Sequence, residues 1–338
     1  MALMGLFAFE PIRRANYELL LVFHLLFPVV IAFLMLHVPW TSPGFIPGII
    51  LHGMTFQSLT IRIYSLILRD AVAIDSIIKV YNGFVTKTAT ASSLMGALTR
   101  LEITTPSSSS SRLGVYYFIR IPTVSGFEWH PFSLALSEGN RLIFYIQAQK
   151  KGSWTERLLH QIPSGKDGSR SVKVSLDGPY GNLSLDLTRY SAVNMIAGGI
   201  GITPFINIIA CLKKDPRFSN VHKINVYWSM RGLELLEVFR GQLLAFCADS
   251  NNLNAADVRF VIANTSHSQK NRLPGFDIPQ PNIELVAGRL DMSSVMANSK
   301  ASASDACVLL CGPQCMVTEA AALAARFSIP AHIEVFNY

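Results

Sequence analysis

Residues 194–209 read NMIAGGIGITPFINII. The apolar run that ends at Gly198 predicts a buried strand, and the apolar residues after the glycines predict a helix. Gly198, Gly199 and Gly201 allow a backbone to approach a diphosphate, and the N-terminus of a helix offers free N–H groups to an anion. The stretch therefore predicts a nucleotide-binding turn. A glycine turn that only packs the strand on the helix remains the alternative, because the spacing is not GxGxxG.

The helix after the turn is expected to use Thr203 as its N-cap and Pro204 as its first residue. Strands and helices then continue to alternate. Runs typical of strands are INVYWSM at 224–230, RFVIA at 259–263, IELVAG at 283–288 and CVLLCG at 307–312, and runs typical of helices are 204–214, 233–246 and 314–326. This alternation predicts a doubly wound, mostly parallel α/β sheet over residues 191–338.

Residues 79–190 have a different pattern. Short runs rich in β-branched and aromatic residues alternate with Pro, Gly and Ser clusters, and this pattern predicts a small antiparallel β-barrel. The runs are VTKTATASS at 85–93, ALTRLEITT at 97–105, VYYFIRIP at 115–122 and LIFYIQAQ at 142–149. His130, Pro131, Phe132 and Ser133 stand late in this region and are followed by GSWTERLL, where Thr155 is expected to cap a short helix. An aromatic, a hydroxyl and a helix N-terminus at a barrel edge are compatible with a flavin site, although a histidine in such a place is more often a packing residue.

Residues 1–78 carry the apolar part of the chain. Leu19–Val38 contains no formal charge and is about as long as a helix that crosses a bilayer. A second and poorer apolar stretch, Gly48–Leu68, follows a Pro-rich loop. Basic residues precede the first stretch and follow the second, and none lies in the loop, so we expect a transmembrane hairpin with both ends in the cytosol. The second stretch is also compatible with a position in the membrane interface.

The composition excludes several classes of protein. Of 338 residues, 50% are apolar and 15% are charged, and the mean hydropathy is +0.34. This argues against a disordered or wholly soluble chain, because soluble proteins average about 25% charged residues. Five cysteines without a CxxC pair argue against a disulfide scaffold or structural zinc. The net charge of +7 suits a nucleotide or a membrane surface as a partner. Nucleic acid is not indicated, because the sequence contains no basic cluster with interleaved aromatics.

Two further motifs stand at turns. DGPYG at 177–181 is expected to form a tight turn, and Cys311-Gly312-Pro313 ends an apolar strand just before a helix. In doubly wound sheets ligands bind beyond the carboxyl ends of the strands, where Gly198 and Cys311 are both expected. A plain buried thiol is an equal alternative for Cys311, and Cys307 and Cys315 are interpreted as structural.

HPFS, GxWT, DGPYG, GGIGITP, CGP and an aromatic C-terminus occur in this order along the chain. The chain thereby resembles the ferric reductase and NADPH oxidase superfamily, with the ferric-chelate reductases as the nearer branch. The resemblance implies a multidomain protein. A partial membrane domain at 1–78 precedes an FAD-binding barrel at 79–190 of the ferredoxin–NADP reductase type, and an NAD(P)-binding domain follows at 191–338.

The resemblance also implies roles for single residues. His130, Pro131, Phe132 and Ser133 would line the flavin, and Gly152, Trp154 and Thr155 would hold its diphosphate side. The nicotinamide nucleotide would meet Gly198, Gly199, Gly201, Thr203 and Pro204, with Cys311, Gly312 and Pro313 near the nicotinamide. Arg231 and Arg289 would bind the adenosine 2′-phosphate and favour NADPH, although Leu290 replaces the proline usual after Gly-Arg. Tyr338 would cover the flavin ring.

The histidines of the first apolar stretch gain a role from the same resemblance. His24 and His37 are 13 residues apart, about 20 Å along a helix. Their spacing is that of the family's fifth membrane helix, which supplies one ligand to each of two haems, and neutral imidazole is a good axial ligand. The family takes the second ligand of each haem from earlier helices. The resemblance therefore implies an N-terminally truncated chain, and it leaves open whether the chain binds haem b.

The predicted function is a membrane-bound oxidoreductase that passes electrons from NADPH through FAD to ferric chelates, with the FAD and NADPH domains in the cytosol and the plasma membrane as the expected location. Its expected partners are NADPH, an electron acceptor, membrane lipid and a full-length reductase chain. Three alternatives stay open. These are a haem-free flavodehydrogenase that feeds a separate carrier, a superoxide-producing oxidase, and a truncated regulatory subunit without activity.

Overall fold

The computed structural model describes residues 85–105, 112–148, 150–163, 168–248, 256–265, 281–303 and 305–334. The chain divides into two compact units, Met1–Phe84 and Val85–Tyr338, and every described residue belongs to the second. The expected membrane hairpin with His24 and His37, and also Tyr338, lie outside the described residues. Among the helices of the described part, none is both long and apolar enough to cross a bilayer.

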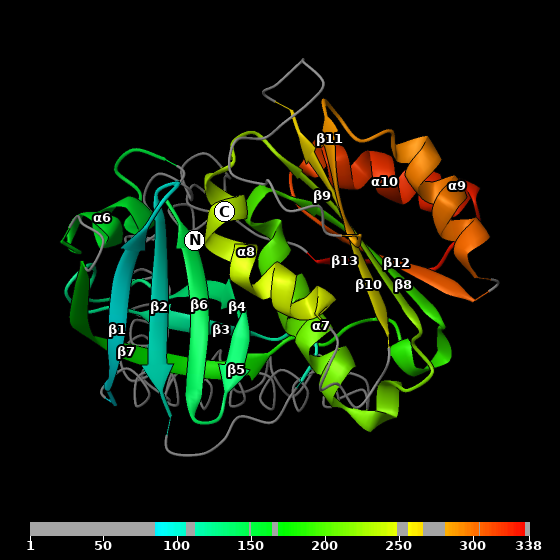
Figure 1. The fold of residues 1–338 in the computed structure, drawn as a ribbon. Coiled ribbons are helices and arrows are strands. Elements are labelled where there is room, and N and C mark those ends of the chain that lie inside the picture. Colours follow the sequence, from blue (N-terminus) through cyan, green and yellow to red (C-terminus); the bar gives the residue numbers. More distant parts are fainter. Residues whose placement is uncertain are drawn as a thin grey trace, which may run out of the picture. The chain divides into compact units, whose positions relative to one another are not determined.

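The first half of the second unit is a curled, seven-stranded sheet in which all neighbours are antiparallel (Figure 1). The strand order is β4-β3-β7-β1-β2-β6-β5. The strands are β1 (Lys87–Leu94), β2 (Leu98–Thr104), β3 (Tyr116–Arg120), β4 (His130–Ser133), β5 (Leu136–Glu138), β6 (Arg141–Gln147) and β7 (Ser169–Tyr180), and one helix, α6 (Trp154–His160), lies between β6 and β7. The antiparallel, barrel-like domain predicted from the sequence is thus present.

Strand β6 explains how the two halves of this unit are joined. Its five central residues are all buried, whereas β3 alternates between buried and half-buried positions. Leu142, Phe144 and Ile146 face the core inside the curled sheet. Ile143 and Tyr145 point the other way and belong to the core of the second half. The period of two along a strand therefore sends one apolar run into two different cores.

The second half is a six-stranded sheet in which all neighbours are parallel. The strand order is β11-β10-β9-β8-β12-β13. The strands are β8 (Ala192–Gly198), β9 (Lys223–Met230), β10 (Asp257–Asn264), β11 (Ile283–Ala287), β12 (Ala306–Cys311) and β13 (Ala331–Glu334). All residues of β8 and β12 are buried, as expected for central strands of a sheet covered on both faces.

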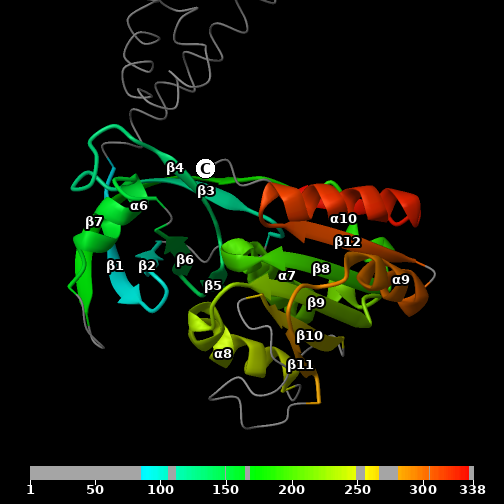
Figure 2. The same ribbon diagram turned by 90° about the horizontal axis from the view of Figure 1, so that it is seen from above.

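Four helices cover the two faces of this sheet (Figure 2). They are α7 (Thr203–Lys214), α8 (Glu234–Cys247), α9 (Met292–Ser302) and α10 (Gln314–Arg326). Helices α7 and α8 share one apolar core with β8 and β9, and α9 and α10 share another with β12. From β8 the strand order runs outward through β9 in one direction and through β12 in the other. The carboxyl ends of β8 and β12 therefore form the topological switch point, where ligands bind in such sheets.

Three local expectations differ from the structure. Asp177–Tyr180 is not a tight turn but the end of the long strand β7, where the register with β3 shifts and where Gly178–Pro179 is a cis peptide bond. Ser153, not Thr155, caps α6, because its side chain accepts the N–H of Glu156. Thr203 is the first residue of α7 and not its N-cap, and its hydroxyl donates to the carbonyl of Ile200.

Candidate functional site

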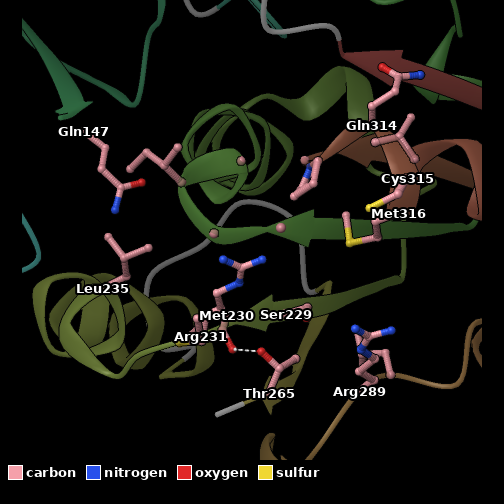
Figure 3. A pocket seen from close by; sticks show the side chains of 18 of the residues that line it. Gln147, Ser229, Met230, Arg231, Leu235, Thr265, Arg289, Gln314, Cys315 and Met316 are labelled. Carbon is pink, nitrogen blue, oxygen red and sulfur yellow. Dashed lines mark hydrogen bonds between the residues drawn. The ribbon is translucent and has the colours of Figure 1, made fainter. Parts of the chain in front are cut away.

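A cavity of about 1060 Å³ lies at the switch point of the parallel sheet (Figure 3). The turn after β8 forms one part of its wall, and the turn after β12 with the start of α10 forms another. Residues at the ends of β9, β10 and β11 complete it on the sheet side. Gly96 and Gln147 of the barrel-like domain also line it. The two domains thus share one cavity.

Three of its glycines lie where two turns of the chain touch each other. A Cβ on Gly201 would lie 2.6 Å from the carbonyl oxygen of Cys311, and one on Gly312 would lie 2.8 Å from the nitrogen of Gly198. A Cβ on Gly198 would collide with Pro313. Both turns are therefore packed backbone against backbone, which only glycine permits.

Gly199 has a different reason to be glycine. Its φ is +54°, which side chains rarely adopt, and a Cβ there would meet no atom of the described chain within 4 Å. The turn consequently presents bare backbone to an open space. Such a cradle, followed by a helix N-terminus, has the shape and polarity that a diphosphate requires.

The carbonyl groups of this turn are held from within the protein. The indole Nε1 of Trp228 donates to the Gly199 carbonyl at 2.8 Å, and the Thr203 hydroxyl donates to the Ile200 carbonyl at 2.8 Å. Trp228 itself is fully buried in β9. The sequence predicted the glycines of the turn but did not predict the tryptophan that holds it.

Arg231 and Arg289 both line the cavity, as do Ser229 and Thr265 (Figure 3). Each follows or ends a parallel strand, so the rule for carboxyl ends could have pointed to all four. Their hydroxyl and guanidinium groups suit a phosphate. The carboxylates of Glu234, Glu319 and Glu334 line the same cavity, so its charge is mixed.

The cysteines are placed differently from the expectation. Cys311 is fully buried, packs against Gly201 and is not among the lining residues, whereas Gly312 and Pro313 are. Burial, reinforced by Glu334, raises the pKa of the Cys311 thiol far above its ordinary value. Cys315 is exposed and lines the cavity instead of being structural.

A second group of predicted residues gathers on the barrel-like domain. The rings of His130 and Phe132 in β4 lie 4.7 and 5.7 Å from the ring of Trp154 in α6, measured between centroids. Ser133 is buried and Pro131 is exposed. His130 Nε2 and Trp154 Nε1 are buried, and neither has a hydrogen-bond partner within the described part of the chain. Two unpaired polar atoms beside aromatic faces fit a flavin, which offers both a ring and hydrogen-bonding groups.

The charge of His130 follows from its surroundings. Burial lowers the pKa of its imidazole, and the Glu128 carboxylate opposes this effect from 3.9 Å, which is too long for a hydrogen bond. We therefore expect a neutral imidazole at pH 7. Arg157 approaches the same Glu128 at 2.6 Å, and neither residue stood out in the sequence.

The polar groups at the start of α6 already have hydrogen-bond partners among neighbouring residues. The N–H of Gly152 is donated to the Glu156 carboxylate, and the Thr155 hydroxyl lies 3.0 Å from the Ser153 hydroxyl. Trp154 is the residue of this group that joins the ring cluster. The arrangement thus brings Trp154 to His130 but does not offer Gly152 and Thr155 as free donors.

Comparison with known proteins agrees with this geometry. Residues 83–184 match the family model of an FAD-binding domain, and residues 190–325 match that of the ferric reductase NAD-binding domain. Ferric reduction oxidase 8, mitochondrial, of Arabidopsis thaliana is 32% identical over 127 residues, which are 36% of this chain and 17% of the relative. NADPH oxidase 1 of Rattus norvegicus is 30% identical over 149 residues, which are 43% of this chain and 26% of the relative.

A solved structure shares the fold of the described unit. The flavohemoglobin of Malassezia yamatoensis, determined with bound FAD and heme, superposes with a TM-score of 0.53 at 18% identity, over 75% of this chain and 61% of that one. The match supports the fold alone. The two consecutive domain matches and the relatives establish that the chain belongs to the ferric reductase and NADPH oxidase superfamily and carries its FAD-binding and NAD(P)-binding domains.

Proposed function

We propose that the chain is a membrane-bound dehydrogenase that passes electrons from NADPH through FAD to ferric chelates. The cavity at the switch point carries this proposal, because residues of both domains line it. A shared cavity suits a nucleotide that binds in one domain and reacts with a flavin held by the other. NADPH supplies a hydride, and FAD supplies the conversion from a two-electron donor to one-electron steps.

In this proposal, the residues of the chain bind and orient NADPH and FAD and exclude water from them. The turn at Gly198, Gly199 and Gly201 would hold the diphosphate of NADPH, and Arg231 and Arg289 its 2′-phosphate. The ring cluster of His130, Phe132 and Trp154 would enclose the flavin, with Ser133 beside it. The same proposal includes the other residues that the resemblance assigns to the flavin or to the nicotinamide nucleotide. These are Pro131, Gly152, Thr155, Thr203, Pro204, Cys311, Gly312, Pro313 and Tyr338.

The dehydrogenase activity can be tested on residues 79–338, which include the whole second unit. We expect the purified segment to retain FAD, NADPH to bleach its flavin band without oxygen, and a soluble dye to be reduced with NADPH. Folded material without flavin would contradict the proposal, and so would a flavin band that NADPH leaves unchanged. A flavin band that dithionite bleaches but NADPH does not would show that flavin is bound and that NADPH binding is lacking.

The membrane part is a proposal that rests on the sequence of residues 1–78. We propose a hairpin there, and His24 and His37 as haem ligands completed by a second chain. An absorption spectrum of the full chain in detergent tests this, because bound haem gives a Soret band that shifts when NADPH is added. We expect H24A/H37A to lose the band. His52, a histidine of the second apolar stretch to which the resemblance gives no ligand role, is the control, and His52→Ala should retain the band. A bleached flavin band without any Soret band would favour a haem-free dehydrogenase.

Oxygen is a second candidate acceptor, because the matched relatives include NADPH oxidase 1. The two acceptors can be separated by measuring NADPH consumption by the full chain with a ferric chelate in argon, and with air in the absence of chelate. Faster turnover with the chelate would support the reductase. Stoichiometric superoxide formation in air, with no effect of the chelate, would favour the oxidase.

A further inference from the structure

Trp228 connects the central sheet to the glycine turn. It is fully buried in β9, and its indole nitrogen donates to the Gly199 carbonyl at 2.8 Å. The two residues are 29 positions apart in the chain. A buried indole N–H needs an acceptor, and the acceptor found here is a backbone group of the turn that lines the cavity.

This bond fixes the direction of a peptide group. In a trans peptide the C=O and the following N–H point in opposite directions, so a carbonyl held by Trp228 turns the Ile200 N–H away from the tryptophan. The next carbonyl, that of Ile200, is held by the Thr203 hydroxyl. Both carbonyl oxygens are thereby engaged by internal donors, which removes two partial negative charges that would otherwise compete with a bound anion.

Trp228 also packs against aromatic rings on the side of the barrel-like domain. Its ring meets the ring of Phe239 in α8 edge to face, with 6.1 Å between centroids and 69° between planes. Phe239 meets Tyr145 of β6 at 4.6 Å and 67°. The hydroxyl of Tyr145 accepts a hydrogen bond from Gln242 at 3.4 Å. A column of three aromatic rings thus runs from β6 to the glycine turn.

We propose that Trp228 is a positioning residue for the diphosphate of the nicotinamide nucleotide. Its indole N–H sets the Gly199–Ile200 peptide so that the amide, and not the carbonyl, is available to the phosphates. The proposal rests on the proposed function, since it presumes that the turn binds a dinucleotide. It concerns the part shared by NADH and NADPH, and it is therefore separate from the roles of Arg231 and Arg289.

The test compares Trp228→Phe with Phe239→Leu in the full chain. The first keeps an aromatic ring and removes the N–H, whereas the second disturbs the same column and keeps the N–H. We expect Trp228→Phe to raise the Kd of NADP⁺ about ten-fold, the loss typical of one hydrogen bond. The Kd of 2′-AMP, which has no diphosphate, should not change. Phe239→Leu should leave both constants within about two-fold of the wild type.

Kinetics give an independent readout. Trp228→Phe should raise the KM of NADPH and of NADH by the same factor while kcat for dye reduction stays within about two-fold, because only nucleotide binding is affected. An unchanged Kd of NADP⁺, or an equal loss with Phe239→Leu, would overturn the proposal. Wild-type protein that binds no NADP⁺ would overturn the proposed function itself, so the two failures are distinguishable.

A gentler substitution covers the case in which Trp228→Phe does not fold. Replacing Trp228 with 3-benzothienylalanine keeps the bicyclic ring and puts sulfur in place of the N–H. Retained FAD absorbance reports that this variant is folded. We expect it to show the same ten-fold loss for NADP⁺ and none for 2′-AMP, and an unchanged Kd of NADP⁺ would contradict the inference.

Discussion

Arg231 and Arg289 line the nucleotide cavity at the ends of two different parallel strands. NADPH differs from NADH only by the 2′-phosphate, and a guanidinium can bind this group through charge-assisted hydrogen bonds. Neither arginine is required for the diphosphate in the proposed arrangement. Discrimination between the two nucleotides is therefore expected to reside in these side chains.

Arg231→Ala should raise the KM of NADPH by about 10- to 100-fold and change that of NADH by less than about three-fold. Steady-state dye reduction with each nucleotide measures the ratio. Arg259→Ala is the matched control, because Arg259 is paired with Glu284 on the exposed side of β10 and does not line the cavity. An equal loss of both nucleotides in Arg231→Ala would refute its 2′-phosphate role.

At the scale of residues, the sequence predicts motifs whose members lie close together along the chain. The glycine turn follows directly from its place between an apolar strand and a helix, whereas the two arginines are predicted only through the family resemblance. Trp228 does not, because INVYWSM predicts only a strand, and the partner of the indole is remote in sequence. Cys315 is misjudged from the sequence, because it is exposed and not structural. For Cys311 the sequence left a buried thiol as an equal alternative, and its packing against Gly201 shows that this thiol is buried.

At the scale of elements, the two turns at the switch point have little room for added side-chain volume. A Cβ on Gly201 would press on the Cys311 carbonyl, and Cys311 lies in β12, whose residues are all buried and cannot retreat. Gly241 lies in α8, is exposed, and a Cβ there would meet no described atom within 4 Å. The two glycines thus offer a crowded and an open position in one domain.

Gly201→Ala is expected to lower the free energy of unfolding of residues 79–338 by about 1 to 3 kcal/mol, because overpacking forces backbone shifts. Gly241→Ala should raise it by about 0.5 to 1 kcal/mol, because alanine favours a helix more than glycine does. Urea denaturation followed by circular dichroism measures both. Equal stability of the two variants would show that the turns can move apart.

Most elements of the α/β domain could be predicted, because buried parallel strands and amphipathic helices have distinct periods. Helix α10 agrees with its predicted range, and β8, β9, β10 and β12 lie where expected. Helix α9, with its sequence MSSVMANSKAS, escapes prediction because few of its residues are strongly apolar. The role of β6 also escapes it, since the run LIFYI does not reveal that its two faces enter different cores.

At the scale of the whole molecule, buried thiols make the free energy of unfolding depend on pH in the alkaline range. Burial raises the pKa of Cys211 to about 11 and that of Cys307 to about 12, against an ordinary value of 9.0. Above pH 9 the unfolded chain releases these protons and the folded chain retains them. The folded state then binds more protons, so stability is complete below pH 9 and falls as the pH rises toward 11 or 12.

The free energy of unfolding of residues 79–338 should thus decrease between pH 8 and pH 10.5, by at most about 1.4 kcal/mol per pH unit for each thiol. Denaturant titrations at several pH values measure the slope. Cys211→Ala should make the slope shallower than in the wild type, because it removes one of the buried thiols. A slope that is the same in the wild type and in Cys211→Ala would contradict the assignment.

The parallel sheet also has a consequence for the order in which the chain is made. The Nδ2 of Asn194 in β8 donates to the Cys307 carbonyl in β12, 113 residues later. At the pace of a ribosome, about 6 to 20 s separate the synthesis of these two strands. The curled sheet of the first domain can close much earlier, because β7 ends at Tyr180. A nascent chain that stalls between Met230 and Ala306 therefore carries a finished first domain beside a central strand with one bare edge, which is the form that chaperones and proteases meet.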